Sequence, residues 1–113
     1  MHDNCCNSSD MVFETDPDQL ETEKKLALQA KALSHPARLR ILHTLYTLDT
    51  QGGCFNGDLV SQLDLAQSTV SEHLRILKQA GFIWAEPNPP KVCYHIKSDA
   101  LQNFSMDMLA LFS

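Results

Sequence analysis

The residues with the most reactive side chains in this 113-residue chain are four cysteines, of which two are adjacent. Cys5 and Cys6 lie in the polar stretch HDNCCNSS, where no apolar neighbours would give them a packing role. Adjacent cysteines close almost no loop, so they would form a poor structural crosslink. Thiolate sulfur prefers soft metal ions to magnesium or calcium. With Cys54 as a third sulfur, the set is typical of a soft-ion site.

The other two cysteines belong to segments with expected regular structure. Cys54 comes just before an expected helix, and the amino end of a helix tends to lower the pKa of a thiol. The chain between Cys6 and the first expected helix has about 12 residues, so at ~3.3 Å per residue it spans ~40 Å and can reach Cys54. Cys93 lies in the expected strand VCYHI, and we interpret it as a small buried hydrophobe apart from this set.

The N-terminus lacks the basic and apolar blocks of a signal peptide, and no apolar run approaches the roughly 20 residues of a membrane span. We therefore expect a cytoplasmic protein that makes no membrane contact. Thiols are reduced in that compartment, so the cysteines are expected to be thiols or metal ligands rather than structural disulfides.

The net charge of −5 is unevenly distributed along the chain. Residues 1–34 carry seven acids and three lysines, and residues 98–113 carry two acids and no base. Residues 35–97 carry six Lys or Arg against five Asp or Glu, a net charge of +1. The acidic ends therefore leave a central segment that is able to present a local basic face to nucleic acid.

The apolar pattern predicts a mainly α-helical domain with a small β-hairpin. Residues 1–17 show little periodicity and end at Pro17, so we expect a flexible arm followed by one domain at 18–113. The first and last helices carry more apolar surface than one small core requires. The expected helices span 18–34, 36–48, 57–63, 67–80 and 98–113, the last capped by Ser98 and Asp99, and the expected strands span 82–86 and 91–96.

Residues 57–81 predict a helix–turn–helix, in which the longer second helix enters a major groove. Val70, Leu74 and Leu77 recur on one face of that helix, which we expect to be buried. The opposite face carries short hydroxyl and amide side chains near its amino end, where the helix dipole attracts phosphate. A hairpin beside the helix–turn–helix makes it a winged helix. Gln67, Ser68, Thr69, Ser71 and Arg75 belong to this polar side of the helix.

Three segments together resemble the ArsR/SmtB family of metal-sensing repressors: KALSHPARLRILHTL, DLVSQLDLAQSTVSEHLRILKQAGFI and VCYHI. The resemblance covers about residues 26–97. It implies a homodimer held by the first and last helices, which would explain their excess apolar surface. It also implies binding to double-stranded operator DNA without ligand and release when a metal or metalloid binds. The resemblance further implies that Gln67, Ser68, Thr69, Ser71 and Arg75 contact DNA. Family members usually have a Gly/Arg-rich wing, whereas EPNPPK has Lys91 as its only cation, so we expect a wing contact with DNA to be made by Lys91.

The resemblance offers several sensing sites, and this sequence lacks two of them. Residues 98–113 contain no histidine, so the C-terminal zinc site of the family is absent. The arsenic pattern C-x-C-D-L is replaced by CFNGDL, which keeps a single cysteine. Some members join N-terminal cysteines to one near the third helix of the partner subunit. We therefore expect As(III) or Sb(III) to be the inducer, bound by Cys5, Cys6 and Cys54.

Several alternatives remain open from the sequence. The same dimer would serve as a thiol-redox sensor, or as a cadmium or lead sensor if His2 or Asp3 adds a fourth ligand. A winged helix used for protein contact and a small thiol enzyme or metal chaperone are further hypotheses. We expect no enzyme activity, because no oxyanion loop or nucleophile setting accompanies the histidines. His35, His43 and His73 are interpreted as packed or capping residues.

Overall fold

A computed structural model describes residues 16–56 and 63–113 of the chain. The arm expected at 1–17 and the short helix expected at 57–63 lie almost wholly outside these ranges. The described elements are α1 (Pro17–Ala32), α2 (Pro36–Thr50), α3 (Gln67–Gln79), β1 (Ile83–Asn88), β2 (Lys91–Ile96) and α4 (Ser98–Leu111). This order of helices and hairpin confirms the predicted winged helix–turn–helix class.

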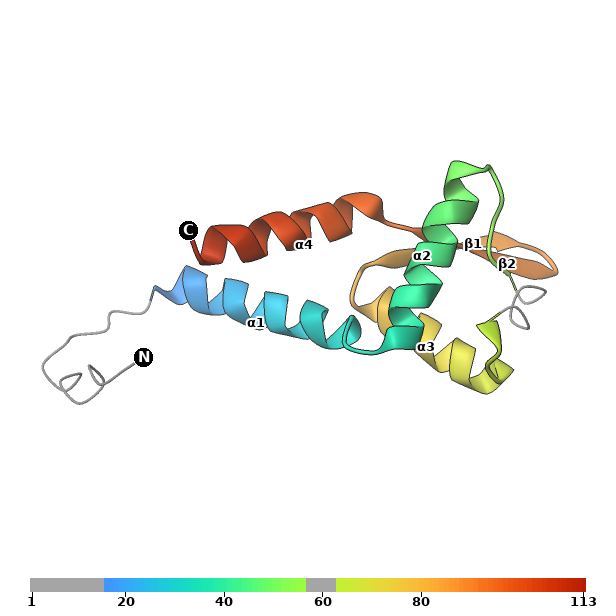
Figure 1. Ribbon diagram of the computed structural model, residues 1–113, viewed down its shortest axis with the longest axis horizontal. Coiled ribbons are helices and arrows are strands. Elements are labelled where there is room, and N and C mark those ends of the chain that lie inside the picture. The colour runs from blue at the N-terminus through green and yellow to red at the C-terminus, as the bar shows by residue number, and fades with distance from the viewer. Residues whose placement is uncertain (1–15, 57–62) are drawn as a thin grey trace, which may run out of the picture.

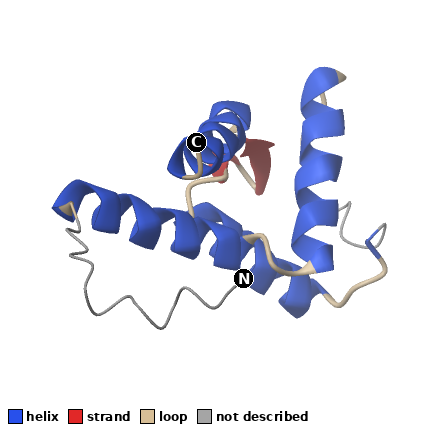
Figure 2. Ribbon diagram, turned by 60° about the vertical axis from the view of Figure 1, so that its left-hand side comes forward, coloured by secondary structure: helices blue, strands red, loops and turns tan. Residues whose placement is uncertain are grey.

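The elements form two parts (Figure 1). Helices α1 and α4 run side by side and form a helical layer. Helix α2, helix α3 and the hairpin gather where α1 ends and α4 begins, and they form the winged part. Figure 2 shows α2 standing at a steep angle to α1, next to the carboxyl end of that helix. The chain thus places its DNA-reading candidate, α3, far from the free ends of α1 and α4.

Prolines begin the first two helices. Pro17 is the first residue of α1, and the Asp16 side chain caps the helix by accepting a hydrogen bond from the Asp18 N–H at 3.0 Å. The helix therefore begins one residue before the expected start at 18. Proline is well suited to the first turn, because its missing N–H would have no partner there. Pro36 begins α2 as predicted, with His35 as the cap.

The core lies in the winged part. Helix α3 buries Val70, Leu74 and Leu77, as predicted, and Gly81 ends it with a φ of 84°, which favours glycine. These side chains meet apolar residues from α2 and from the start of β1. The buried cluster comprises Ala32, Ile41, Leu42, Leu45, Phe55, Leu63, Val70, Leu74, Leu77, Phe82 and Ile83.

Strands β1 and β2 pair in antiparallel register from Ile83↔Ile96 to Asn88↔Lys91. Strand β1 extends two residues beyond the predicted end, through Pro87. A two-stranded sheet has a free edge on each strand, so the missing N–H of a proline is tolerated there. Phe55 adds a single bridge to the outer edge of β2, where the Tyr94 N–H donates to the Phe55 carbonyl at 2.9 Å.

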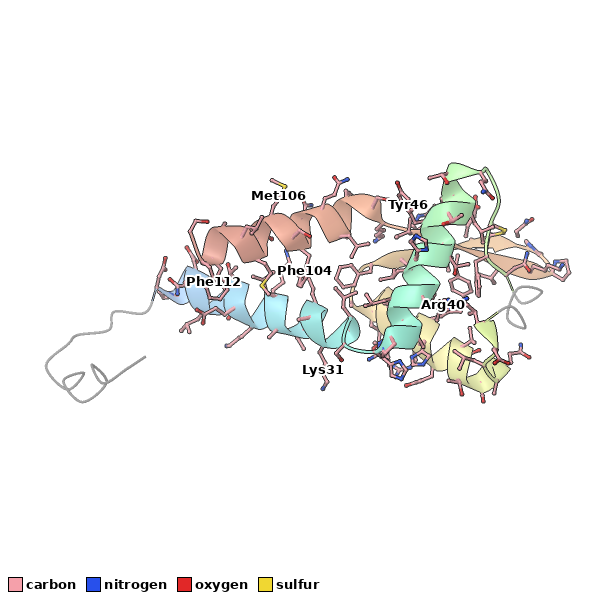
Figure 3. All side chains as sticks on the ribbon, viewed as in Figure 1. Lys31, Arg40, Tyr46, Phe104, Met106 and Phe112 are labelled. Atoms are coloured by element: carbon pink, nitrogen blue, oxygen red, sulfur yellow. A yellow bond between two sulfur atoms is a disulfide. The ribbon has the colours of Figure 1, made fainter. Side chains whose placement is uncertain are left out.

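Helix α4 has one apolar side against the protein and another exposed. Phe104 packs edge-on against Phe82, and Figure 3 shows Met106 on the side of α4 that faces away from α1. No residue of α4 is fully buried, and Leu109 and Phe112 are 72 % and 82 % exposed. Ser98 is the first helical residue rather than the predicted cap, because Lys97 occupies the cap position.

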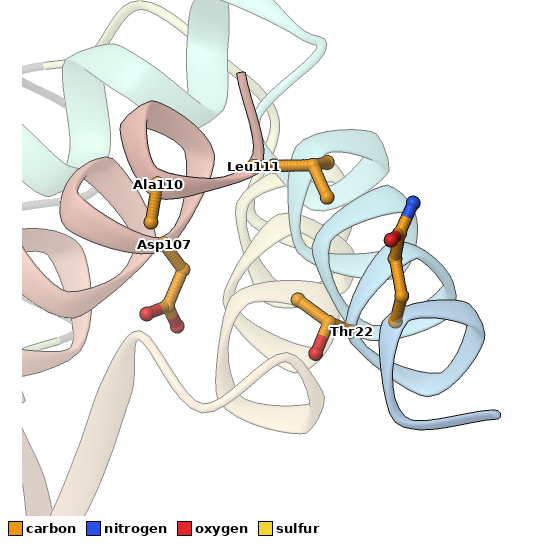
Figure 4. Close-up of a pocket in the computed structure, with 5 residues that line it drawn as sticks. Thr22, Asp107, Ala110 and Leu111 are labelled. Atoms are coloured by element: carbon orange, nitrogen blue, oxygen red, sulfur yellow. The ribbon is translucent and has the colours of Figure 1, made fainter. Parts of the chain in front are cut away.

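The free ends of α1 and α4 do not close on each other. Between them lies an open hollow of about 280 Å³, lined by both helices (Figure 4). Its lining residues are Gln19, Thr22, Asp107, Ala110 and Leu111. The two helices therefore leave a solvent-open space between their free ends.

Candidate nucleic-acid interface and cysteine pair

Helix α3 carries a continuous exposed polar face opposite its buried one. All five side chains predicted to contact DNA from this helix are exposed: Gln67, Ser68, Thr69, Ser71 and Arg75. The cap position is Ala66, whose side chain makes no capping hydrogen bond. The first-turn N–H groups and the positive end of the helix dipole thus accompany short side chains that allow a phosphate to approach. Lys91 is exposed on β2, where it pairs with Asn88 next to the wing turn.

Arg75 is held on the surface of α3 by two neighbours. Its guanidinium donates to both oxygens of Glu72, at 2.9 and 2.5 Å, and to the Gln79 side chain at 3.1 Å. The hydrogen bond and charge of Arg75 hold the pKa of the Glu72 carboxyl below its usual range, and Glu72 raises the pKa of Arg75. The candidate interface therefore contains an ionised carboxylate as well as a cation. Sequence analysis did not identify this pairing.

Next to this face, α3 and β2 enclose a shallow hollow of about 210 Å³. Ser71, Arg75 and Lys78 line it from the helix, and Tyr94 lines it from the strand. Two cationic side chains and two hydroxyl groups thus face the same space. This arrangement can accept a phosphate group of a nucleic-acid backbone.

His73 lies under the polar face and connects α3 to α2. It is 7 % exposed, and its Nδ1 accepts a hydrogen bond from Arg38 Nη1 at 3.1 Å, so its proton lies on Nε2. Burial lowers the pKa of His73, and the nearby His35 and Arg38 lower it further. Arg38 also donates from Nε to the Ala32 carbonyl at 2.6 Å, at the carboxyl end of α1.

The histidine predictions had mixed outcomes. The packed role of His73 is confirmed, and so is the capping role of His35, whose Nδ1 accepts from the Ala37 N–H at 3.0 Å. His43 is exposed on α2, where it lines a groove between α2 and α4, so the prediction of a packed or capping role was wrong for this residue.

Cys54 and Cys93 form a disulfide between the segment after α2 and strand β2, with Cα atoms 5.4 Å apart. The prediction that the cysteines form no structural disulfide was wrong, and so was the separation of Cys93 from the reactive set. Burial of Cys93, which is 4 % exposed, is confirmed. The pairing has a local cause: Phe55 bridges to Tyr94, so the segment that carries Cys54 lies against β2 beside Cys93. Cys5 and Cys6 lie outside the described residues.

Close to the disulfide in sequence, an ion cluster connects the end of α2 to the hairpin. Asp49, near the end of α2, accepts from His95 Nδ1 at 2.8 Å and from the Ile96 N–H at 3.0 Å. His95 Nε2 donates to Glu86 of β1 at 2.9 Å, and Trp84 stacks on the imidazole with ring centres 4.7 Å apart. The hydrogen bond to Asp49 is the main cause of the raised pKa of His95, with Glu86 adding to it. No local sequence pattern indicates this cluster, because Asp49 and His95 are 46 residues apart.

The sequence of this chain is similar to those of known bacterial regulatory proteins. Residues 35–84, which contain α2, α3 and the start of β1, match the model of the bacterial regulatory protein family arsR. A biofilm growth-associated repressor from Agrobacterium fabrum is 31 % identical over 88 residues, covering 78 % of this chain and 72 % of that protein. The chain belongs to the ArsR family. It is a DNA-binding transcriptional regulator, and its relatives are named as regulators rather than enzymes.

Solved structures of similar proteins have the same fold. Reduced HlyU from Vibrio cholerae superimposes with a TM-score of 0.62 at 26 % identity, covering 79 % of this chain and 90 % of that one. The homodimeric winged helix-turn-helix DNA-binding domain of Mb0332 from Mycobacterium bovis gives a TM-score of 0.67 at 22 % identity, covering 88 % and 89 %. At the latter identity the likeness establishes the fold alone.

Two further properties concern only the described residues. Within 16–56 and 63–113, no group of three or more His, Cys, Asp or Glu side chains is placed to hold a metal ion. The same part of the chain contains no helix long and apolar enough to cross a membrane. The three-sulfur set predicted from the sequence includes Cys5 and Cys6, so it is not tested by either observation.

Proposed function

We propose that this ArsR-family regulator is a repressor that binds operator DNA as a homodimer and leaves it when trivalent arsenic or antimony binds its thiolates. The polar face of α3 is the observation that supports binding to operator DNA. It is fully exposed, anchored by a buried opposite face, and adjacent to a cationic hollow beside the wing. The relative from Agrobacterium fabrum is named a repressor, which supports the same sign of regulation here.

Dimerisation is supported by the exposed apolar side chains of the helical layer. Leu20 and Leu28 of α1, Met106 and Leu109 of α4, and Phe112 just after α4 are all substantially exposed. Apolar surface of this extent on two adjacent helices marks a protein contact in a soluble molecule. A symmetric pair of such layers would place two copies of α3 on successive major grooves. Mb0332, which shares the fold, is described as homodimeric.

The proposed inducer site rests on Cys54. This cysteine is partly exposed in the segment that leads from α2 to the helix–turn–helix. An ion bound there, with Cys5 and Cys6 as the other two ligands, would act directly on the approach to α3. Sulfur ligands favour soft ions, and three thiolates suit trivalent arsenic or antimony. The coupling is reciprocal, so operator DNA must weaken arsenite binding by the factor by which arsenite weakens DNA binding.

Operator release by reduced protein tests this function. Fluorescence anisotropy of a labelled duplex from the DNA upstream of the gene should show salt-dependent binding that arsenite reverses about 5- to 150-fold. A Cys54→Ser variant should bind the same duplex and ignore arsenite. Binding that is independent of salt and sequence, or release that persists in the variant, would contradict the proposal.

Thiol-redox sensing is the second candidate, and the Cys54–Cys93 disulfide favours it. In this version, oxidation alone changes the placement of the wing and releases the operator. Hydroperoxide without metalloid should then dissociate the complex, and dithiothreitol should restore it. Arsenite added to reduced protein should leave the complex intact.

A further inference from the structure

We propose that Cys54 and Cys93 form a reversible redox gate on the inducer site, in which Cys93 is the resolving cysteine that withdraws Cys54 from metalloid binding under oxidising conditions. This inference rests on the proposed function, because it assigns a regulation to the same Cys54 sulfur. A sulfur in a disulfide has no thiolate to offer a soft ion. The oxidised chain is therefore a repressor that stays on its operator and cannot be induced.

The two sulfur atoms remain neighbours when the disulfide is reduced, because other contacts hold their segments together. On one side, the Tyr94 N–H donates to the carbonyl of Phe55, whose side chain is buried in the core. On the other side, Asp49 binds both the His95 ring and the Ile96 N–H. The segment from Asp49 to Phe55 is thus attached to β2 at two points with Cys54 close to one of them. Such attachment removes most of the loop-closure entropy that disulfide formation across 39 residues would otherwise cost.

The surroundings also assign different roles to the two cysteines. Cys54 is partly exposed and Cys93 is buried, so a dissolved oxidant meets Cys54 first. The side-chain amides of Asn56 and Asn88 lie 3.9 Å from the sulfur atoms of Cys54 and Cys93 respectively. Each amide N–H can donate to the sulfur beside it, and the thiolate is the reactive species in both steps.

The chemistry requires a hydroperoxide as the oxidant. The Cys54 thiolate attacks the outer oxygen, so an S–O bond forms, the O–O bond breaks, and an alcohol or water leaves after taking up a proton. The Cys93 thiolate then attacks the Cys54 sulfur, so the S–S bond forms and the S–O bond breaks, releasing hydroxide that leaves as water. Two thiols lose two electrons in total, and one hydroperoxide gains them.

The first arm of the test follows this chemistry in a Cys5→Ser/Cys6→Ser double variant, which keeps only Cys54 and Cys93. One equivalent of hydrogen peroxide should consume both thiols, and peptide mass spectrometry should find them in one disulfide. Adding Cys93→Ser as a third substitution should leave a Cys54 sulfenic acid that reacts with dimedone. If the double variant accumulates the dimedone adduct instead of the disulfide, the gate is overturned.

The second arm measures function in the full wild-type chain bound to operator DNA. Oxidised protein should keep its DNA affinity within about twofold, should need at least tenfold more arsenite for release, and should regain its response in dithiothreitol.

The outcomes separate the two proposals. If reduced wild type ignores arsenite, the proposed inducer fails and the gate fails with it. If reduced wild type responds but oxidised protein responds equally, the gate alone fails. If oxidation by itself releases the operator, the gate is replaced by direct redox sensing.

Discussion

The winged part and the helical layer of this molecule differ in how much of their apolar surface they bury. The winged part buries an almost continuous apolar cluster and connects its edges with the Asp49–His95–Glu86 ion cluster and a disulfide. Helix α4 buries no residue fully and exposes Leu109 and Phe112. The winged part thus forms its apolar core within one chain, whereas the layer of α1 and α4 leaves exposed apolar side chains that the proposed dimer would cover.

Removing a core side chain from the winged part should have the largest effect. Leu45 is completely buried in α2, so Leu45→Ala should lower the free energy of unfolding by about 2–5 kcal/mol, through lost burial and a cavity. Leu39→Ala is the matched control, because Leu39 lies on the same helix but is 52 % exposed, and it should change stability by at most about 0.5 kcal/mol. Urea unfolding at fixed protein concentration measures both. If both variants lost the same free energy of unfolding, the buried and exposed sides of α2 would contribute equally to stability, and the prediction would be wrong.

A charge on the exposed side of α4 should have the next largest effect, and on assembly rather than folding. Leu109→Glu should weaken the dimer by at least about 2 kcal/mol, roughly 30-fold, because a carboxylate would be desolvated in the proposed interface. Sedimentation equilibrium and operator binding should both report it. Asn103→Glu introduces the same charge on another side of α4 and should leave assembly unchanged. A Leu109→Glu protein that remains dimeric would place the interface elsewhere.

Within the winged part, Glu72→Gln should strengthen DNA binding about 3- to 10-fold at low salt. The substitution removes a carboxylate from the polar face of α3 and releases the Arg75 guanidinium for phosphate. Anisotropy titrations over a range of salt concentrations should show the gain shrinking as salt rises. Glu21→Gln makes the same change on α1, outside the candidate interface, and should give a much smaller gain. Weaker binding in Glu72→Gln would mean that Glu72 itself contacts a base.

The smallest effect concerns the pH dependence of the wing. The pKa of His95 is raised in the folded protein, so its contribution to stability is fully present below about pH 6.5 and is lost as the pH rises through the folded value. Wild type should therefore lose up to about 1 kcal/mol more than His95→Gln between pH 6 and pH 9. Thermal unfolding at several pH values measures the difference. Parallel pH profiles for the two proteins would remove His95 as the cause.

Local patterns were sufficient to predict most of the fold. The 3.6-residue spacing of Val70, Leu74 and Leu77 predicted the buried side of α3, and Gly81 predicted its end. The same spacing determined which polar side chains are exposed opposite them. Apolar excess on the outer helices also predicted, correctly, side chains that the single chain leaves exposed.

Contacts between distant residues were beyond reach, because nothing local encodes them. The Cys54–Cys93 pair depends on a bridge between Phe55 and Tyr94, and the Asp49–His95 contact depends on where α2 ends relative to β2. Each residue alone has an ordinary interpretation: a thiol, a helix-end acid, a strand histidine. Only the three-dimensional register of β2 against the segment after α2 brings them together.

Arg38 connects the helical layer to the winged part through hydrogen bonds to both. Its guanidinium donates to the Ala32 carbonyl at the end of α1 and to His73 of α3, so one rigid planar group bridges the helical layer and helix α3. If α1 turns about its carboxyl end, the carbonyl moves relative to the imidazole, and the guanidinium cannot stay bonded to both. Helix α3 must then move together with α1, or the hydrogen bond between Arg38 and His73 must break.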